Sequence, residues 1–316
     1  MQLDAACKGY PPHLPAMELK DAGRQGWQLL RGDLSFPLAV LKDSALQHNI
    51  DWMRDFCQTR GLDIAPHGKS TMSPELYDRQ IAAGAWGISF ANVFQAALGA
   101  RHGVRRIIIA NQVFQAADLD SLSALLQTHA GLQVWFLVDS ADQVQMIEAW
   151  RTARASSTVF TVLMEIGIAG YRAGCRDHEQ ALALARLVRR SPALRLAGIE
   201  CYEGSLATCN HAHDRLGVAA LMQRVQALAV AFEAEDLFEN DEVLLTAGGS
   251  AIFDLVAEHL KPHLQHPTRG ILRSGCYVTH DHVQYRKHLA CVGERLQLRE
   301  TLRPALEVIS VVQSCP

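Results

Sequence analysis

Residues 158–175 read TVFTVLMEIGIAGYRAGC, an apolar run that ends in a turn containing three glycines. A run that is apolar at nearly every position suits a strand buried on both faces, as in a parallel sheet. The longest apolar stretch, Val159 to Ala169, is interrupted by Thr161 and Glu165 and falls short of the roughly 18 residues of a membrane span. We therefore predict a buried strand here and no membrane-spanning segment.

The same pattern recurs on both sides of this stretch. Further runs lie at 37–41, 62–68, 86–92, 105–113, 132–139, 194–202, 241–249 and 269–278. Helical segments separate them; Ser73-Pro74 begins one that ends at Gly84, Asp118 or Asp120 begins another, and Ser140 or Asp142 a third. Eight strand–helix units over about 217 residues favour a (β/α)8 barrel over a doubly wound sheet.

The two ends of the chain do not follow this rhythm. The run 37–41 and the segment 295–314 are both strand-like but lie outside the repeated units. We predict an α/β fold with a (β/α)8 TIM-type barrel over residues 43–290 and a partial second β domain made from both chain termini, residues 1–42 and 291–316. We expect this second domain to be incomplete, because the chain stops at Pro316 directly after a strand-like run.

The composition excludes several classes of protein. Of 316 residues, 49% are hydrophobic and 20% charged, with a formal net charge of −3, which is typical of an ordinary globular protein and not of a disordered, fibrous or nucleic-acid-binding chain. The N-terminus lacks the apolar core of a signal peptide, which predicts a cytoplasmic location. The eight cysteines are scattered without a C-x-x-C, so free thiols are expected.

In such barrels the chemistry takes place at the carboxyl ends of the strands. The first strand ends in Pro66-His67-Gly68-Lys69-Ser70-Thr71. A lysine at this place is either a Schiff-base nucleophile or an ordinary solvated side chain. Arg172 lies in a glycine-rich turn, where it either projects into the mouth of the barrel or lies on the surface. The glycine spacing there is not that of a dinucleotide-binding loop.

The later strand ends carry further candidates. Tyr202 follows one strand, and Gly248-Gly249-Ser250 follows the next, directly before a helical segment. Backbone N–H groups at a helix N-terminus bind phosphate well, although a plain turn with a serine cap is the alternative. The last strand ends in Arg273-Ser274-Gly275-Cys276-Tyr277.

Two histidine pairs are candidate metal ligands: His211 with His213, and His280 with His282. Alternate residues share a face only on a strand, and neither pair lies clearly in one. No cysteine or carboxylate stands at a standard metal-binding spacing beside them. We therefore interpret them as solvated loop histidines and predict no metal site in this chain.

In this order, the motifs resemble those of the pyridoxal 5′-phosphate (PLP) enzymes with an alanine-racemase-like barrel. Within that family the chain is most similar to the D-serine dehydratase, D-threonine aldolase and D-amino-acid deaminase branch. The most specific stretch is PHGKSTMSP at 66–74, and the resemblance covers most of residues 36–281. The supporting segments are 170–174, 202–204, 247–250 and 273–277.

The resemblance implies a role for each residue. Lys69 would hold PLP as an aldimine and, once freed, remove the Cα proton of the substrate. Arg172 would bond the phenolic oxygen of the cofactor, Tyr202 would lie near its pyridine nitrogen, and His67 would pack on or orient the ring. The backbone and side chains implied to hold the phosphate are those of Gly248, Gly249, Ser250, Gly275 and Cys276.

The resemblance also implies an activity. The expected function is a PLP-dependent lyase, either a dehydratase (deaminase) or an aldolase, acting on D-hydroxy amino acids such as D-serine or D-threonine. A homodimer is expected, with a small D-amino acid as the substrate and neither nucleic acid nor membrane as a partner. The family uses a divalent metal, but its His/Cys ligands belong to a C-terminal region with no counterpart in this chain.

Four alternatives stay open at this point. The chain could be a non-catalytic PLP-binding barrel of the homeostasis type, a truncated inactive family member, a racemase without its second base, or a barrel that binds no PLP. A reducible absorbance band with added PLP separates the last from the rest. Turnover of D-serine and D-threonine separates the lyase from the non-catalytic barrel.

Overall fold

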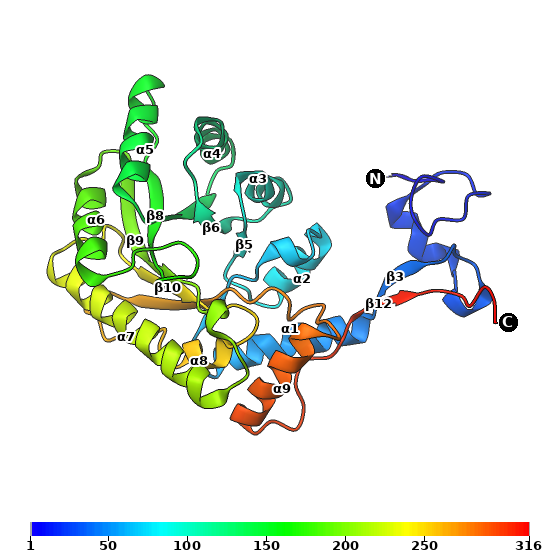
Figure 1. Ribbon diagram of the computed structural model, residues 1–316. Helices are drawn as coiled ribbons and strands as arrows, with labels where there is room; N and C mark the ends of the chain where they lie inside the picture. Colours follow the sequence, from blue (N-terminus) through cyan, green and yellow to red (C-terminus); the bar gives the residue numbers. More distant parts are fainter. Residues whose placement is uncertain (1, 316) are drawn as a thin grey trace.

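The computed structural model describes residues 2–315, and its centre is a parallel eight-stranded sheet surrounded by helices (Figure 1). The strands are β4 (Asp63–Ile64), β5 (Ile88–Phe90), β6 (Arg106–Gln112), β7 (Gln133–Val138), β8 (Phe160–Ile166), β9 (Leu194–Cys201), β10 (Val243–Ala247) and β11 (Thr268–Leu272). Their order is β4-β11-β10-β9-β8-β7-β6-β5. Between β4 and β5 the Trp86 N–H donates to the Ile64 carbonyl and the Ser89 N–H to the Pro66 carbonyl, both at 2.9 Å. The predicted (β/α)8 barrel is confirmed.

A helix follows each barrel strand and covers the outside of the sheet. The helices are α1 (Asp43–Gln58), α2 (Pro74–Ala82), α3 (Val93–Arg101), α4 (Ala116–Thr128), α5 (Ala141–Ala153), α6 (His178–Arg190), α7 (His211–Ala234), α8 (Phe253–Ala257) and α9 (Gln284–Leu296). Short 3-10 helices are η1 (Leu19–Gln25), η2 (Leu29–Arg31), η3 (Gly68–Ser70) and η4 (Gly204–Leu206).

Of two predicted helix starts, the one at Ser140 is confirmed and the one at Asp118 or Asp120 is wrong. Ser140 caps α5, because its hydroxyl accepts a hydrogen bond from the Gln143 N–H at 3.4 Å. The start predicted at Asp118 or Asp120 is wrong, since α4 begins at Ala116 after an extended Gln115 that provides no side-chain cap. Asp118 lies instead in the first turn, where its negative charge favours the positive end of the helix dipole.

The barrel strands are buried on both faces, as their composition predicts. A ring of apolar side chains fills the inside of the barrel: Ala65, Ile108, Trp135, Leu137, Leu163, Ala197, Leu244 and Ile271. Side chains two positions further along a strand point to the same face. Glu165 therefore stands above Leu163, Thr246 above Leu244, and Arg273 above Ile271. The inside of the barrel changes from apolar to polar toward the carboxyl ends of the strands.

The chain termini form a separate small β module beside the barrel (Figure 1). Strand β3 (Leu38–Leu41) pairs antiparallel with β12 (Leu306–Ile309), and β1 (Gln2–Leu3) pairs antiparallel with β2 (Met17–Glu18). A second β part made from both termini is thus confirmed. The domain boundary at residue 290 stays a prediction; α9 continues across it, and Arg295 forms an ion pair with Asp254 of α8 at 2.6 Å.

By length and composition, α7 is the one described helix that could cross a membrane. Its apolar residues Leu221, Met222, Val225 and Leu228 are buried, and the helix packs against β9, α6 and α8. Burial of this kind is what a core helix of a barrel requires.

Candidate active site

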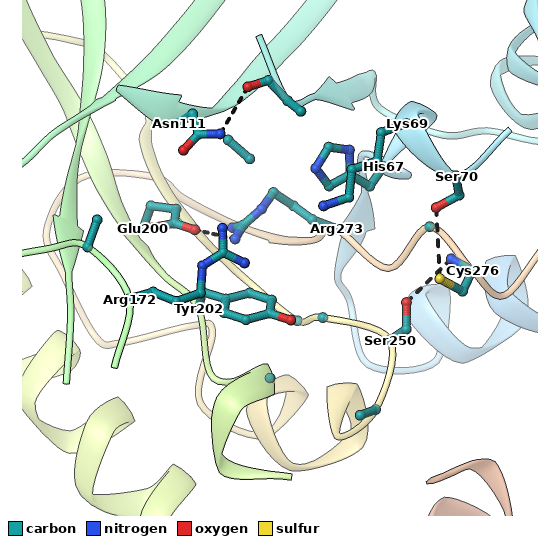
Figure 2. A pocket seen from close by; sticks show the side chains of 18 of the residues that line it. His67, Lys69, Ser70, Asn111, Arg172, Glu200, Tyr202, Ser250, Arg273 and Cys276 are labelled. Atoms are coloured by element: carbon teal, nitrogen blue, oxygen red, sulfur yellow. Dashed lines mark hydrogen bonds and ion pairs between the residues drawn. The ribbon is translucent and has the colours of Figure 1, made fainter. Parts of the chain in front are cut away.

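A cavity of about 340 Å³ opens at the carboxyl ends of the strands. Figure 2 shows several of its side chains converging from different strand ends. All nine residues predicted for the site line it: His67, Lys69, Arg172, Tyr202, Gly248, Gly249, Ser250, Gly275 and Cys276. The structure therefore brings together side chains that are spread over more than half of the sequence.

Lys69 lies on η3, the short 3-10 helix that follows β4, and its side chain borders the cavity (Figure 2). The position of η3 is fixed by Tyr77 of α2, whose hydroxyl donates to the Gly68 carbonyl at 3.0 Å. Gly68 is required here, because a Cβ would lie 2.7 Å from the Phe90 ring. The packing of a glycine against an aromatic ring thus places the lysine at the rim.

His67 lies beside Lys69 and is held neutral. Burial, together with the nearby positive charges of Lys69, Arg273 and Arg172, lowers its pKa to about 3. Its Nδ1 atom is buried without a hydrogen-bond partner among the described residues. A buried nitrogen of this kind is available to a bound molecule.

Arg172 and Tyr202 both line the cavity, and the guanidinium of Arg172 lies over the ring of Tyr202 (Figure 2). The guanidinium carbon lies 4.8 Å from the centroid of the tyrosine ring, a cation–π contact. Burial raises the pKa of Tyr202, the charge of Glu203 raises it further, and Arg172 acts against both. The tyrosine is therefore a neutral hydroxyl at physiological pH.

The turn that carries Arg172 depends on glycines. Gly170 and Gly174 have φ of +81° and +104°, a region that side chains disfavour. The Gly174 N–H also donates to Asp139 Oδ2 at 2.8 Å, which connects the turn to the end of β7.

The segment 248–250 differs from its predicted geometry. It is not a helix N-terminus, because α8 begins only at Phe253 and has Ile252 at its cap position. The N–H groups of Gly248 and Gly249 donate to the buried carboxylate of Glu203, at 3.0 and 2.6 Å. The Ser250 hydroxyl instead accepts from the Cys276 N–H at 3.3 Å, which joins the two segments (Figure 2).

Three charged residues inside the barrel received no role in the sequence prediction of the site. Glu165, Glu200 and Arg273 all border the cavity. Arg273 forms an ion pair with Glu200, with side chains 5% and 2% exposed, and donates to Thr246 Oγ1 at 2.9 Å. Burial raises the pKa of Glu200 to about 8, and Arg273 acts against this rise. Charged residues within otherwise apolar strand segments, as in TVLME and LAGIE, were the available signal.

Not all of the paired histidines are solvated loop residues, so that interpretation is wrong in part. His211 and His213 lie in the first turn of α7. His280 is buried against the ring of Tyr285, with ring centroids 5.1 Å apart, and its Nδ1 has no hydrogen-bond partner among the described residues. Its neighbour His282 is exposed.

The chemistry of the donor set fits a phosphorylated pyridine aldehyde. A primary amine, a guanidinium, a neutral phenol and the Ser250 hydroxyl border one cavity. Gly275 packs closely against the segment that carries Lys69, because a Cβ there would lie 2.5 Å from the His67 carbonyl oxygen and 2.7 Å from Ser70 Oγ.

Gly275→Ala should weaken PLP binding by about tenfold or more, since the added methyl group displaces the segment that carries Lys69 at a cost of about 1–3 kcal/mol. Fluorescence titration with PLP measures the change. Gly23→Ala is the matched control, because nothing lies within 4 Å of a Cβ at Gly23. Equal affinity in both variants would contradict the close packing proposed for Gly275.

Comparison with known proteins identifies similar chains. The family described as alanine racemase, N-terminal domain, matches residues 42–285. A 3-hydroxy-D-aspartate aldolase of Paracoccus denitrificans (strain Pd 1222) is 27% identical over 207 residues, covering 65% of this chain and 52% of that protein. A D-threonine aldolase of Arthrobacter sp. is 29% identical over 219 residues, covering 69% of this chain and 56% of that protein. The chain thus spans about half the length of these curated relatives.

A solved structure shares the fold. The D-threo-3-hydroxyaspartate dehydratase from Delftia sp. HT23 superposes with a TM-score of 0.65 at 26% identity. The match covers 87% of this chain and 67% of that chain.

Proposed function

Because the chain belongs to the alanine racemase N-terminal domain family, we propose that it is a PLP-dependent lyase acting on D-amino acids that carry a β-hydroxyl group. The observation that carries this proposal is the position of Lys69 on η3, on the same cavity as Arg172 and Tyr202 (Figure 2). The similarity to hydroxy-amino-acid aldolases supports the choice of substrate class.

Five residues would hold the cofactor. Lys69 Nζ would bond to it covalently, Arg172 would donate to its ring oxygen, and Tyr202 would lie near the ring nitrogen. The Ser250 hydroxyl would donate to the phosphate, and the Cys276 N–H, which donates to Ser250 Oγ at 3.3 Å, would hold that hydroxyl in place. We assign the Gly248 and Gly249 N–H groups a weaker part, because Glu203 already accepts from them. When bound, PLP supplies an electron sink for negative charge at Cα.

The protein's own residues supply the proton transfers. The Lys69 amine, released when substrate takes its place, is the base for the Cα proton. His67 stays neutral beside it, because burial lowers the pKa of the imidazole to about 3. A neutral neighbour does not add to the positive charge around the amine. Tyr202 keeps its proton at physiological pH, so its hydroxyl can donate a hydrogen bond.

The two possible reactions use the same arrangement. Loss of the β-hydroxyl yields a 2-oxo acid and ammonia, whereas cleavage of the Cα–Cβ bond yields glycine and an aldehyde. Among the described residues no cluster of three His, Cys, Asp or Glu could hold a metal ion, so we assign no metal ligand in this chain. The proposal includes a cytoplasmic homodimer with no nucleic-acid or membrane partner.

The test begins with absorbance spectra of the purified protein and PLP, before and after borohydride. We expect a band in the visible or near-ultraviolet range that borohydride abolishes. D-serine, D-threonine and D-threo-3-hydroxyaspartate are then assayed for ammonia with 2-oxo acid, and for glycine with aldehyde; the L-isomers are the controls. A reducible band with no turnover of any D-substrate, with or without added divalent metal, would contradict the lyase and support a non-catalytic PLP-binding barrel.

A further inference from the structure

Two cysteines and a histidine meet where the segment before α7 contacts α9. The Cys209 sulfur lies 3.5 Å from His288 Nδ1 and 4.0 Å from the Lys287 carbonyl oxygen. Cys291 lies one helical turn after His288 on α9, and the Cys209 thiol is near enough to raise the pKa of the Cys291 thiol. This group has no part in the function proposed above, and no disulfide joins the two cysteines.

The backbone on the α7 side is held by a buried carboxylate. Asp214 Oδ1 accepts from the Thr208 N–H at 2.9 Å and from its hydroxyl at 2.6 Å, and Oδ2 accepts from the Cys209 N–H at 3.0 Å. Cys209 itself has φ of +64°. A non-glycine residue in this region persists only where its surroundings impose it. The thiol is therefore presented to α9 by a fixed turn.

The α9 side is equally fixed. His288 and Cys291 are three positions apart and so lie on one face of the helix. Arg295, one turn further, forms two hydrogen bonds with Asp254 of α8 at 2.6 and 2.8 Å. A second contact joins the two sides, since His211 Nε2 lies 3.4 Å from Glu294 Oε2.

We propose that Cys209 and Cys291 form a thiol–disulfide exchange site whose substrate is a small disulfide of the glutathione type. Both cysteines are half-buried, so a small molecule can reach them. Close approach of two thiols on fixed backbone segments is the geometric requirement for a reversible disulfide.

The exchange consists of two successive attacks of a thiol on a disulfide. Cys209 sulfur transfers its proton to His288 Nδ1 or to water and attacks one sulfur of the small disulfide, whose S–S bond breaks and releases one small thiol after protonation. Cys291 sulfur then loses its proton and attacks the Cys209 sulfur of the mixed disulfide. The second small thiol leaves, and the protein has lost two hydrogens to the small disulfide.

The two cysteines have different roles. Burial and the neighbouring Cys209 thiol together raise the pKa of Cys291 to about 11, so this thiol is seldom ionised. Cys209, with the imidazole of His288 beside it, is the thiol that attacks first. Cys291 then resolves the mixed disulfide.

The bond would join two walls of the main cavity. His288 on α9 and Gly204, five residues before Cys209, both line it. A disulfide between Cys209 and Cys291 would therefore fix these walls relative to one another. It would also close a long loop of chain, which stabilises the folded state.

The test treats the full chain with oxidised glutathione and maps its disulfides by peptide mass spectrometry without reductant. We expect a linked pair of peptides containing Cys209 and Cys291, loss of two hydrogens, and a thermal midpoint several degrees higher that returns with dithiothreitol. The proposal would be overturned if glutathione modified the exposed Cys315 and no peptide pair linked Cys209 to Cys291.

Two cysteine variants test the attack on the small disulfide and the resolution of the mixed disulfide separately. Cys291→Ser should stop at one glutathione bound to Cys209, whereas Cys209→Ser should leave Cys291 unmodified. Cys7→Ser, at a half-buried cysteine outside the barrel, should form the link as the unmodified chain does. If Cys291→Ser acquires no adduct at Cys209 while its circular dichroism is unchanged, Cys209 is not the attacking thiol.

Discussion

Lys69→Ala is expected to abolish borohydride-reducible binding of PLP and to lower lyase turnover by about 10³-fold or more. The reason is that one amine provides both the covalent attachment and the base for the Cα proton. No other lysine borders the cavity among the described residues. Absorbance spectra before and after borohydride, followed by mass spectrometry of the reduced protein, measure the attachment site.

The control is Lys20→Ala, which removes an exposed lysine in the N-terminal segment. This variant should retain the reducible band and the turnover. A band of equal size in Lys69→Ala would place the attachment on another amine. The chain would then be a barrel that has lost the expected site, and the roles of Arg172 and Tyr202 would have to be reassigned.

Arg273→Leu is expected to lower the free energy of unfolding by about 3–5 kcal/mol at alkaline pH, because it leaves the Glu200 carboxylate buried without its partner. The loss should be smaller near neutral pH. Burial raises the pKa of Glu200 to about 8, and removal of the arginine, which opposes this rise, moves it higher. At lower pH the variant therefore buries a neutral carboxylic acid, and most of the free-energy cost of an unpaired buried carboxylate is absent.

The direction of the pH dependence follows from proton binding. Between the ordinary pKa of glutamate, about 4.3, and the raised value in the folded protein, the folded state holds a proton that the unfolded state has lost. The stability contributed by this group is therefore present at low pH and decreases as the pH rises through that window. Urea unfolding at about pH 6 and about pH 9 should show a larger deficit for Arg273→Leu at the higher pH.

The matched control is the double variant Arg273→Leu with Glu200→Gln. It removes both charges, so at alkaline pH it should be more stable than Arg273→Leu alone. The single variant Glu200→Gln leaves a guanidinium without a carboxylate and should be destabilised at both pH values. The same deficit for Arg273→Leu at pH 6 and pH 9 would contradict a buried, titrating Glu200.

The residues at the strand ends could be predicted because they follow local sequence patterns. Apolar runs separated by helical segments predict parallel strands, and the carboxyl ends of parallel strands meet at one rim of a barrel. For that reason Lys69, Arg172 and Tyr202 could be placed together before their distances were known. The pattern could not show that Glu203 would accept from the Gly248 and Gly249 N–H groups, because that contact joins two different strand ends.

Hydrophobic periodicity and turn chemistry are local properties, and they were enough to predict the barrel and the residues at the carboxyl ends of its strands. The three-dimensional packing established which charges pair inside the barrel, as with Glu200 and Arg273, and that Cys209 lies against His288 of α9. It also decided that β3 and β12, from opposite ends of the chain, pair with each other. Such contacts depend on strand register and barrel curvature, which set the distance between residues far apart in the chain and leave no local pattern.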